Sequence, residues 1–334
     1  MSLALAVAHP NVALSKYWGK RDGEGNFPAV PSVSVTLAGL QTRTSVRFDE
    51  SLTEDRVVLN GEAAAEGPRA RVIELLDRVR AASRDRRRAD VRSRNDFPTA
   101  SGLASSASGF AALALASVRG AGLDWSVERV SDLARRSSAS AARSLFGGFV
   151  ELDAGQQGAP PEALLSARPV APPDHLPLVV LVCVVTEAAK DVGSTDGMRA
   201  TLARSPYAAA WLEHAPRLHA RLHDALLARD FVAVGELAEA SCLSMHASAI
   251  AAGVTYWNGA TLGLMTAIRA LRSEGLAVFA SVDAGPHVKA LTLAADAPRV
   301  RAALQGVAGV TRIIEARPGE GAALVQDARA EDRP

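Results

Sequence analysis

Residues 97–110 read FPTASGLASSASGF, and this stretch decides how the first half of the chain is expected to fold. Pro98 and Gly102 mark the end of a predicted strand, and glycine lets the backbone turn and approach a ligand closely. An apolar helix then opens with Leu103, Ala104, Ser105, Ser106 and Ala107. The first amides of a helix have no internal partner, and with the helix dipole and serine hydroxyls they form a site for anions.

The stretch therefore predicts a phosphate-binding loop, but its spacing alone leaves a second interpretation open. A helix capped by serine, with small residues that allow close packing, would have much the same sequence. The loop is not of the Walker A type, because no Gly-Lys-Ser/Thr sequence follows the glycine.

Upstream of this loop the sequence predicts mainly strands. The segments VPSVSVTLAG and TRTSVRFDE are rich in β-branched residues and divide near Gly39, which predicts a β-hairpin. Asn60-Gly61 predicts a second tight turn. Residues 68–83 carry apolar side chains at helical spacing, which predicts a helix before the strand that leads into Pro98.

Downstream, helices are predicted over residues 103–118 and 126–137, followed by a strand in SLFGGFVELD. Residues 154–175 are rich in Gly, Pro and Ala, which indicates a connection between domains. The later elements are expected to be a strand over 178–186, helices at about 206–228, 230–250 and 258–273, a strand over 276–285, a helix in RVRAALQGV and a strand in VTRIIEARP.

This order of elements mixes hairpins and helices, and it favours an α+β fold in two lobes. We expect an N-terminal ATP-binding domain over residues 1–175 and a C-terminal domain over residues 176–326. The polar end, residues 327–334, is expected to be frayed.

Composition excludes several classes of function. The 334 residues are 48% hydrophobic with a formal net charge of +1, so no overall field recruits nucleic acid or a membrane. The longest strongly apolar run, LPLVVLVCVV over residues 176–185, is about half a membrane span and predicts a buried strand. Cys183 and Cys242 are too few for a disulfide framework. The start MSLALAVAHP lacks the pattern of a signal peptide, so a cytoplasmic protein is expected.

The basic residues are distributed unusually. Of the 37 lysines and arginines only four are lysine, namely Lys16, Lys20, Lys190 and Lys289. The arginine side chain ends in a planar, forked guanidinium group, whereas lysine ends in a compact ammonium group that can approach a single oxygen or phosphate closely. In a chain that builds its basic surface from arginine, the remaining lysines are candidates for positions that need such a charge, although chance could also leave four.

The pattern Pro-x3-Gly-Leu-x-Ser-Ser-Ala in the opening stretch resembles the phosphate loop of the galactokinase, homoserine kinase, mevalonate kinase and phosphomevalonate kinase (GHMP) superfamily. Within that superfamily, five segments resemble the diphosphomevalonate decarboxylase family: KYWGKRD, FPTASGLASSASGF, ARSLFGGFVE, KDVGSTDGM and DAGPHVK. They follow the family's order between residue 9 and about residue 290, and all four lysines fall within or directly beside them.

The resemblance implies a GHMP-kinase-like fold with the active site in the cleft between its two lobes. The N-terminal lobe would be ribosomal-S5-domain-2-like, and the C-terminal lobe a ferredoxin-like α/β sandwich. The family is usually homodimeric. It uses ATP to phosphorylate the 3-hydroxyl of mevalonate 5-diphosphate, and loss of CO2 and phosphate then gives isopentenyl diphosphate for isoprenoid biosynthesis. Hydroxide leaves poorly, so phosphorylation supplies the leaving group that elimination requires.

Three residues are expected by resemblance to be catalytic. Asp283 would face the 3-hydroxyl and either orient it or accept its proton, and orientation suits the low basicity of a carboxylate better. Lys16 would keep Asp283 ionised and offset charge during phosphoryl transfer. Arg143 would hold the substrate carboxylate with its fork.

The resemblance also implies binding residues. Around the substrate phosphates it places Tyr17, Lys20, Ser138, Ser140, Lys190 and Ser194. The ATP phosphates would be cradled by Pro98, Gly102, Leu103, Ala104, Ser105, Ser106 and Ala107, with Mg2+ carried on the ATP rather than in a protein motif. Each serine could instead be a helix cap.

Three further side chains receive non-catalytic or open assignments. Trp18 is expected to pack beneath the lysines. His246 could lie near the substrate or be structural. His219 and His223, four residues apart without a third ligand, are expected on a solvated helix face rather than at a metal.

The sequence departs from the family's usual residues near the expected pocket, at Ser15, Val30, Pro31, Ala139, Ala142 and His287. These departures leave open whether the substrate carries one 5-phosphate or two. The alternatives are therefore the same reaction on mevalonate 5-phosphate, a kinase that stops before decarboxylation, and a non-catalytic sensor of the same ligands.

Overall fold

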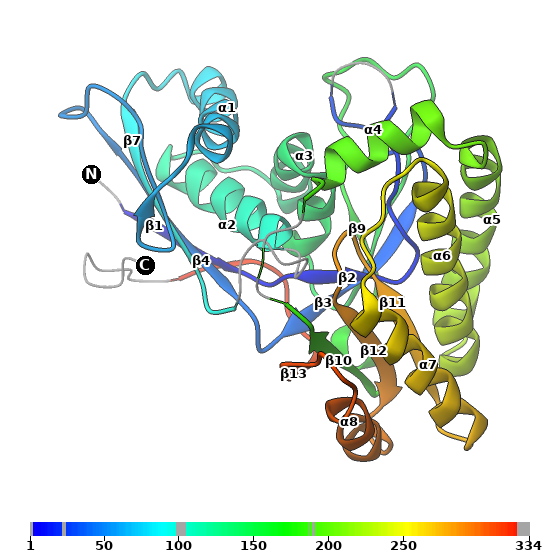
Figure 1. The fold of residues 1–334 in the computed structure, drawn as a ribbon. Coiled ribbons are helices and arrows are strands. Elements are labelled where there is room, and N and C mark those ends of the chain that lie inside the picture. Colours follow the sequence, from blue (N-terminus) through cyan, green and yellow to red (C-terminus); the bar gives the residue numbers. More distant parts are fainter. Residues whose placement is uncertain (1–2, 22–24, 98–104, 187, 189–190, 326–334) are drawn as a thin grey trace.

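Two β-sheets and the helices packed on them make up the protein (Figure 1). The computed structural model describes residues 3–21, 25–97, 105–186, 188 and 191–325. Within these residues the sheets have six and eight strands. The mixture of helices and mainly antiparallel strands confirms the predicted α+β class.

The six-stranded sheet belongs mostly to the first part of the chain. Its order is β14 (Ala323–Leu324), β1 (Ala4–Ala8), β4 (Thr42–Asp49), β7 (Arg88–Asn95), β5 (Arg56–Leu59) and β6 (Glu62–Ala63). Asn60 and Gly61 join β5 to β6 with φ angles of 51° and 88°. These positive φ values are the ones that a two-residue hairpin turn requires, and they confirm the turn predicted there.

This part of the chain also forms three helices and a 3-10 helix: α1 (Glu66–Ser83), α2 (Ser105–Gly120), α3 (Val127–Ser137) and η1 (Ala139–Leu145). Of these, α2 packs on the sheet, and α3 and η1 pack on α2. Helix α2 packs against β1 and β4 with alanines at residues 111, 112, 114 and 116 that have no exposed surface. Small side chains let a helix approach a sheet closely. Packing on the sheet therefore holds α2 in place and fixes the position of the first residues of the helix, Ser105 and Ser106.

The eight-stranded sheet joins the two halves of the chain. Its order is β11 (Val278–Val282), β12 (Val288–Leu293), β10 (Leu178–Val184), β13 (Arg312–Pro318), β3 (Ser32–Ala38), β8 (Phe149–Leu152) and β9 (Arg168–Ala171), with β2 (Asn11–Ala13) also paired to β3. Within this sheet the two halves are joined by the pairing of β13 with β3, at Arg317 with Ala38 and Pro318 with Leu37.

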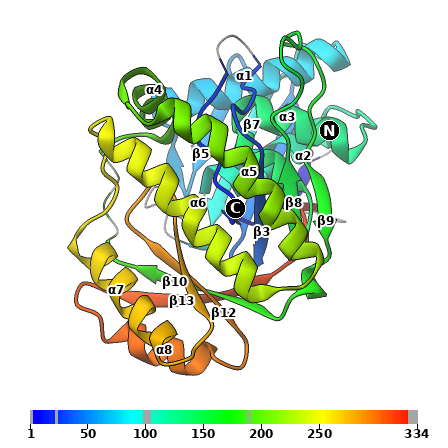
Figure 2. The same ribbon diagram turned by 90° about the vertical axis from the view of Figure 1, so that its right-hand side faces the viewer.

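Both faces of β10 are buried, which explains its continuous apolar sequence. Val180 and Val182 face α5 (Ala208–Leu227) and α6 (Phe231–Ala251). Val179, Leu181 and Cys183 face α7 (Gly259–Ser273) and α8 (Ala297–Gln305). Figure 2 shows α5 and α6 side by side, with α7 and α8 beside β12 and β13. Successive strand residues point to opposite faces, so a strand covered on both sides must be apolar throughout.

The hairpin predicted around Gly39 is wrong. Both strands exist, but β3 pairs with β2, β8 and β13, whereas β4 pairs with β1 and β7 in the other sheet. Local composition identified the strands, but it carries no information about partners that lie far away in the sequence.

Several short elements were not predicted. They are η1, β9, η2 (Pro173–His175), α4 (Ser194–Arg204), β12 and β14. The strand β9 lies within residues 154–175, which were expected to form a plain connection. Five of these elements have only two to seven residues and carry too little periodicity to be recognised from sequence, whereas the 11-residue α4 was simply missed.

The remaining predictions about the core can be compared directly. Cys183 and Cys242 are free thiols, and both are buried. No helix in the described part of the chain is long and apolar enough to cross a membrane. The predicted frayed tail, residues 327–334, lies outside the described residues.

Candidate active site

A cavity of about 1280 Å³ lies between the helices of the first half of the chain and those of the second. Helices α1, α2 and α3 contribute Arg71, Ser105 and Ser137 to its lining, and α4 and α6 contribute Asp196 and Met245. In Figure 1, α1 and α2 lie to the left of α4. The walls of the cavity therefore come from parts of the chain that are far apart in sequence.

A carboxylate with two lysines lies at the cavity, and the carboxylate and one of the lysines line it. Asp283 follows β11 and lines the cavity with 23% of its side chain exposed. Lys16 Nζ donates to Asp283 Oδ1 at 2.7 Å, and Lys289 Nζ on β12 is 3.1 Å from Asp283 Oδ2. We call Asp283, Lys16 and Lys289 the carboxylate–lysine trio. Burial alone would raise the pKa of Asp283, but the two lysines outweigh it and hold that pKa well below its usual range.

The contacts of Lys16 show how the chain fixes this group. Its ammonium donates to the carbonyl oxygen of Ala13 at 3.0 Å and to Ser281 Oγ at 2.7 Å, in addition to Asp283. An ammonium has three protons, so all of its donors are used. Its backbone amide donates to Ser241 Oγ at 3.0 Å. Lys16 is therefore held from three segments and lies 2% exposed.

Arg143 is a buried cation held by neutral groups. Its guanidinium donates to Ser34 Oγ at 2.9 Å, Ser32 Oγ at 2.6 Å and Asn11 Oδ1 at 3.4 Å. No salt bridge joins it to a carboxylate among the described residues, and burial lowers its pKa to about 10. A buried charge without a counter-ion is costly, so an anion that enters the cavity would be bound there favourably.

Tyr17 and three serines line the cavity beside Arg143. The Tyr17 hydroxyl is buried without a hydrogen-bond partner among the described residues, and burial raises its pKa. Ser138 Oγ and Ser140 Oγ lie 3.2 Å apart, and Ser137 Oγ is buried without a described partner. Unsatisfied buried hydroxyls are rare in proteins, and both of these belong to residues that line the cavity.

At the start of α4 the lining is basic. Lys20 Nζ donates to Thr195 Oγ1 at 3.2 Å, next to Ser194 in the first turn of the helix. Burial lowers the pKa of Lys20, as do the nearby cations Arg71 and Arg199. Gly197 allows α4 to come this close, because a Cβ there would lie 2.2 Å from Tyr256 Oη and 3.0 Å from the ring of Trp18.

The predicted phosphate loop is only partly described. Ser105 and Ser106 begin α2 and line the cavity, whereas Ala107 is buried in the protein. Pro98, Gly102, Leu103, Ala104 and Lys190 lie outside the described residues. No group of three or more His, Cys, Asp or Glu that could hold a metal lies within the described ranges. Serine hydroxyls without an acidic cage fit a Mg2+ that is bound mainly by nucleotide phosphates.

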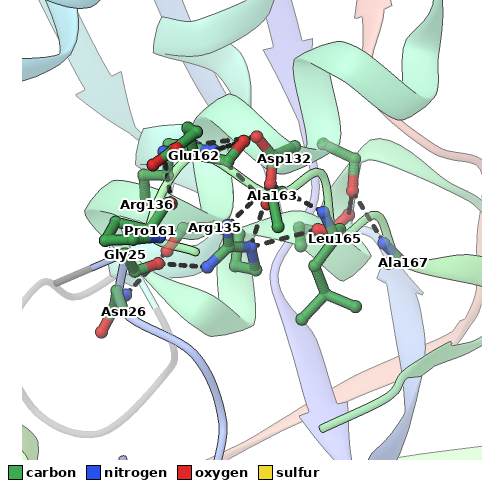
Figure 3. Close-up of polar contacts among 12 residues, drawn as sticks. Gly25, Asn26, Asp132, Arg135, Arg136, Pro161, Glu162, Ala163, Leu165 and Ala167 are labelled. Atoms are coloured by element: carbon green, nitrogen blue, oxygen red, sulfur yellow. Dashed lines mark hydrogen bonds and ion pairs between the residues drawn. The ribbon is translucent and has the colours of Figure 1, made fainter. Parts of the chain in front are cut away.

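Two arginines on α3 bind loop residues, some of which line the cavity; Figure 3 shows these contacts. Asp132 Oδ1 accepts from Arg135 Nη2 at 2.7 Å, and Asp132 Oδ2 accepts from Arg136 Nε at 2.9 Å. We call Asp132, Arg135 and Arg136 the arginine clamp. The remaining guanidinium donors bind main-chain carbonyl oxygens of Gly25, Pro161, Glu162, Ala163 and Leu165.

The histidines and Trp18 were predicted with mixed success. Trp18 is buried and donates to Thr201 Oγ1, which agrees with a packing role. His246 is buried, its Nε2 lies 3.1 Å from the carbonyl oxygen of Val282, and burial lowers its pKa to about 3. The solvated face predicted for His219 is wrong. That side chain is buried between Ser15 Oγ at 3.0 Å and Glu151 Oε1 at 2.8 Å, because α5 packs across β8.

The six departures from the family's usual residues do not gather in the cavity. Only Ala139 among them lines it. Val30 and Ala142 are buried in apolar clusters, Ser15 binds His219, and His287 Nδ1 accepts from the amide of Val185 at 3.3 Å. Ser15 and Ala142 are nevertheless the chain neighbours of Lys16 and Arg143, which do line the cavity.

Some residues of the site were missed by sequence reasoning. Lys289, Asn11, Ser32, Ser34 and Ser281 all contact the residues expected to be catalytic. Only Lys289 carried a signal, because it was one of the four lysines. The serines and Asn11 resemble ordinary strand residues, and only the packing of strands from both halves brings them to the site.

The arrangement suits chemistry on a small polyanion. An ionised carboxylate can accept a hydrogen bond from a hydroxyl, a buried arginine can bind a carboxylate, and serines with helix N-termini can bind phosphates. Together they would position a phosphoryl group, a hydroxyl and a carboxylate in one cavity.

Comparisons with known proteins agree with this geometry. A family model described as the diphosphomevalonate decarboxylase-like N-terminal domain matches residues 8–163, and one described as the mevalonate 5-diphosphate decarboxylase C-terminal domain matches residues 180–329. The first match contains Lys16 and Arg143 and the second contains Asp283, so both sides of the cavity lie within matched regions.

Individual relatives are similar over most of their length. The human protein named diphosphomevalonate decarboxylase is 36% identical over 314 residues, which cover 88% of this chain and 77% of the relative. A protein of Haloferax volcanii named phosphomevalonate decarboxylase is 36% identical over 307 residues, which cover 90% and 91%. A solved structure of MDDEF in complex with MVAPP, AMPPCP and magnesium has a TM-score of 0.89 at 36% identity and covers 97% of this chain and 98% of that chain.

Proposed function

The chain belongs to the diphosphomevalonate decarboxylase family, and we propose that it decarboxylates mevalonate 5-diphosphate in an ATP-dependent reaction of the mevalonate pathway. The products are isopentenyl diphosphate, ADP, phosphate and CO2. The observation that carries the proposal is the position of Asp283, ionised between two lysines, in the same cavity as the buried Arg143.

The reaction has two parts that one cavity must serve. The γ-phosphoryl group of ATP is transferred to the 3-hydroxyl, which gives ADP and a 3-phosphorylated intermediate. The bond between the carboxylate carbon and C2 then breaks, its electron pair forms the C2–C3 double bond, and the 3-phosphate leaves with the electrons of the C3–O bond. No further reactant is required.

Asp283 orients the 3-hydroxyl in this scheme. The two lysines hold its pKa well below the usual range, so it is a weak base towards an alcohol. Asp283 accepts the proton of the 3-hydroxyl late in the reaction, once formation of the new P–O bond has made the 3-oxygen acidic. Late proton transfer agrees with a loose transition state for phosphoryl transfer. Lys16, whose three ammonium protons are all used, acts through Asp283 rather than as a direct donor to phosphate.

Arg143 positions the substrate carboxylate. Its buried charge and its neutral partners leave it able to bind an anion. An arginine that bound the carboxylate more tightly before the reaction than in the transition state would slow the loss of CO2, so its contribution is orientation. Tyr17, Lys20, Ser138, Ser140, Lys190 and Ser194 would bind the 5-diphosphate or the transferred phosphate.

The nucleotide would lie at the start of α2. Ser105 and Ser106 line the cavity there and would hold the ATP phosphates, together with Pro98, Gly102, Leu103, Ala104 and the amide of Ala107. When bound, Mg2+ on the nucleotide neutralises phosphate charge.

A second candidate is the same reaction on mevalonate 5-phosphate, which would give isopentenyl phosphate. It is supported by the Haloferax relative, whose identity of 36% equals that of the human diphosphomevalonate decarboxylase. A kinase that stops at the phosphorylated product is the remaining alternative, and the presence of Asp283, Lys16 and Arg143 together argues against it.

Product analysis with Mg-ATP decides among these reactions. The purified protein is given mevalonate 5-diphosphate or mevalonate 5-phosphate, and ADP and CO2 are followed together, with Asp283→Asn as the inactive control. Equal ADP and CO2 from the diphosphate support the leading proposal. A large preference in kcat/KM for the monophosphate would replace it with the second candidate, and ADP without CO2 would reduce it to a kinase.

We further propose a cytoplasmic homodimer with two domains. Family resemblance supports the dimer, the two free cysteines are consistent with a reducing compartment, and the family matches end at residue 163 and begin at residue 180, either side of the division at residue 175. Light scattering, cell fractionation and limited proteolysis within residues 154–175 test the three statements, and a monomer, a membrane fraction or cleavage elsewhere would contradict them.

A further inference from the structure

We infer that Lys289 is a positioning residue for the reaction, because it holds the second oxygen of the Asp283 carboxylate while Lys16 holds the first. The inference deepens the proposed function and rests on it, since it concerns the carboxylate placed beside the 3-hydroxyl. Lys289 lies outside the residues that sequence reasoning assigned to the site.

Strand register brings Lys289 to this position. On β12, Lys289 lies directly opposite Ser281 of β11 and Val182 of β10. Residues opposite each other in a sheet point to the same face, and residues two apart on a strand do so as well. Ser281 and Lys289 therefore share one face of the sheet, which is also the face that Lys16 reaches when it donates to Ser281. Asp283, directly after the end of β11, contacts both lysines there.

The two lysines act on different oxygens. Lys16 Nζ lies 2.7 Å from Oδ1, and Lys289 Nζ lies 3.1 Å from Oδ2. A carboxylate held at one oxygen can still rotate about its last bond, whereas one held at both oxygens keeps its plane. The pairing therefore fixes the direction of the lone pairs that face the cavity, and it leaves one positive charge in excess beside a polyanionic substrate.

The other titratable groups around Asp283 do not replace this role. Arg143 acts on it from η1, and Cys242 and His246 act on it from α6. Burial raises the pKa of Cys242 and lowers that of His246 to about 3, so both are neutral near pH 7. Arg143 is bound to Ser32 and Ser34. The cations in contact with the carboxylate within the described residues are Lys16 and Lys289.

Simple packing would not require a lysine at this position. Lys289 is 1% exposed, and burial lowers its pKa, which is the cost of placing an ammonium inside the protein. A methionine of similar length would fill the same space without that cost. The Asp283 charge raises the pKa of Lys289 in return, so the two groups keep each other ionised.

The first test does not depend on activity. The chain has only four lysines, so labelling with ε-15N-lysine gives a simple spectrum in which arginine replacements, made one at a time, assign the signals. Asp283→Asn should shift the signals of both Lys16 and Lys289 and leave that of Lys20 in place. A Lys289 signal that does not respond to Asp283→Asn would overturn the inference.

The second test measures the pH profile of turnover. Lys289→Met should lower kcat by about tenfold or more with little change in KM, and should raise the apparent pKa of the acidic limb by about 1–3 units, because removal of an opposite charge raises a carboxylate pKa by that amount. Lys289→Arg restores the charge and should restore most of the pH profile. An unchanged kcat and acidic limb in Lys289→Met would contradict the inference.

A matched control separates this effect from a loss of packing. Thr292 lies on the same strand, is fully buried and donates to the carbonyl oxygen of Ala277, away from Asp283. Thr292→Val should leave the acidic limb where it is in the wild-type protein. If Thr292→Val moved that limb as far as Lys289→Met, a general loss of packing would explain both, and the assigned role would be wrong.

The two tests also separate the inference from the proposed function. If the wild-type protein released neither ADP nor CO2 with either substrate, the proposed function would fail, and the lysine spectrum would still decide whether Lys289 pairs with Asp283. If Lys289→Met did not fold, the same spectrum of the wild-type and Asp283→Asn proteins would decide the matter.

Discussion

Asp132 and Asp283 are each flanked by two cations, but the two groups differ in what they do. Asp132 is paired with Arg135 at 2.7 Å and Arg136 at 2.9 Å in the arginine clamp. Asp283 is paired with Lys16 at 2.7 Å and Lys289 at 3.1 Å in the carboxylate–lysine trio. The charges, distances and burial are similar, yet one group fastens loops and the other faces the cavity.

The difference follows from the shape of the cations. A guanidinium has five donors in a plane, so Arg135 and Arg136 bind Asp132 and still reach carbonyl oxygens of the chain around Gly25 and residues 161–165 (Figure 3). An ammonium concentrates its charge at one point, so two of them can approach one carboxylate and leave a face of it open. Arginine therefore fastens loop residues, some of which line the cavity, and lysine supports the reactive carboxylate.

Asp283→Asn should have the largest effect on turnover of all the substitutions that compare the two groups. Turnover is expected to fall by about 1000-fold, because the amide cannot accept the 3-hydroxyl proton and no longer balances the lysines. ATP binding should be retained, because Ser105 and Ser106 belong to another part of the cavity. ADP release at saturating substrate and nucleotide titration measure the two effects, and turnover within tenfold of the wild-type protein would contradict the role.

Arg143→Lys should have the next largest effect. The charge remains but the fork is lost, so the substrate carboxylate is misplaced and kcat/KM should fall by about 100-fold. Arg168→Lys, at an exposed partner of Glu151 outside the cavity lining, is the matched control and should change kcat/KM little. Equal effects of the two substitutions would show that Arg143 is merely structural.

Exchanging lysine for arginine in the carboxylate–lysine trio, and arginine for lysine in the arginine clamp, tests whether each group needs its own type of cation. Lys16→Arg should lower kcat by about tenfold or more, since a larger group must fit a buried site and overpacking costs about 1–3 kcal/mol. Arg136→Lys should change kcat by less than about twofold, because it affects contacts with carbonyl oxygens of loop residues. Normal activity in Lys16→Arg would mean that the point charge is not what the position requires.

Asp132→Asn should affect stability rather than chemistry. It leaves Arg135, which is fully buried, without its counter-ion, and breaking such a pair costs about 3 kcal/mol. The urea midpoint should therefore fall while kcat stays within about threefold. A variant with normal stability and greatly reduced kcat would reverse the roles assigned to the two groups.

The smallest effect is a pH dependence of stability. The pKa of Asp283 is lowered in the folded protein, so its pairing stabilises the fold above the unfolded pKa of about 3.9 and is lost as the pH falls through the folded value. The difference in unfolding free energy between the wild-type protein and Asp283→Asn should therefore be constant from about pH 5 to 7 and shrink below about pH 4. A difference that grew on acidification would mean that the pKa is raised instead.

Sequence reasoning succeeded where a signal is local or recurs as a motif. Helical spacing predicted α1, α3 and α5 to α8 within a few residues, and Asn60-Gly61 predicted a turn that is present. The motif segments led to Lys16, Arg143 and Asp283, which the structure brings to one cavity. It failed where partners are distant: β3 and β4 do not form a hairpin, and His219 is buried against Ser15 and Glu151.

The sequence by itself therefore determined the α+β class, the positions of most helices and the family, because these depend on periodicity and on short motifs. It also singled out Lys289 by the scarcity of lysine, without a role. Only the tertiary structure decided that Lys16, from the segment after β2, and Lys289, from β12, meet at the two oxygens of Asp283. That meeting depends on strand register and on packing between segments about 270 residues apart, and no local pattern encodes it.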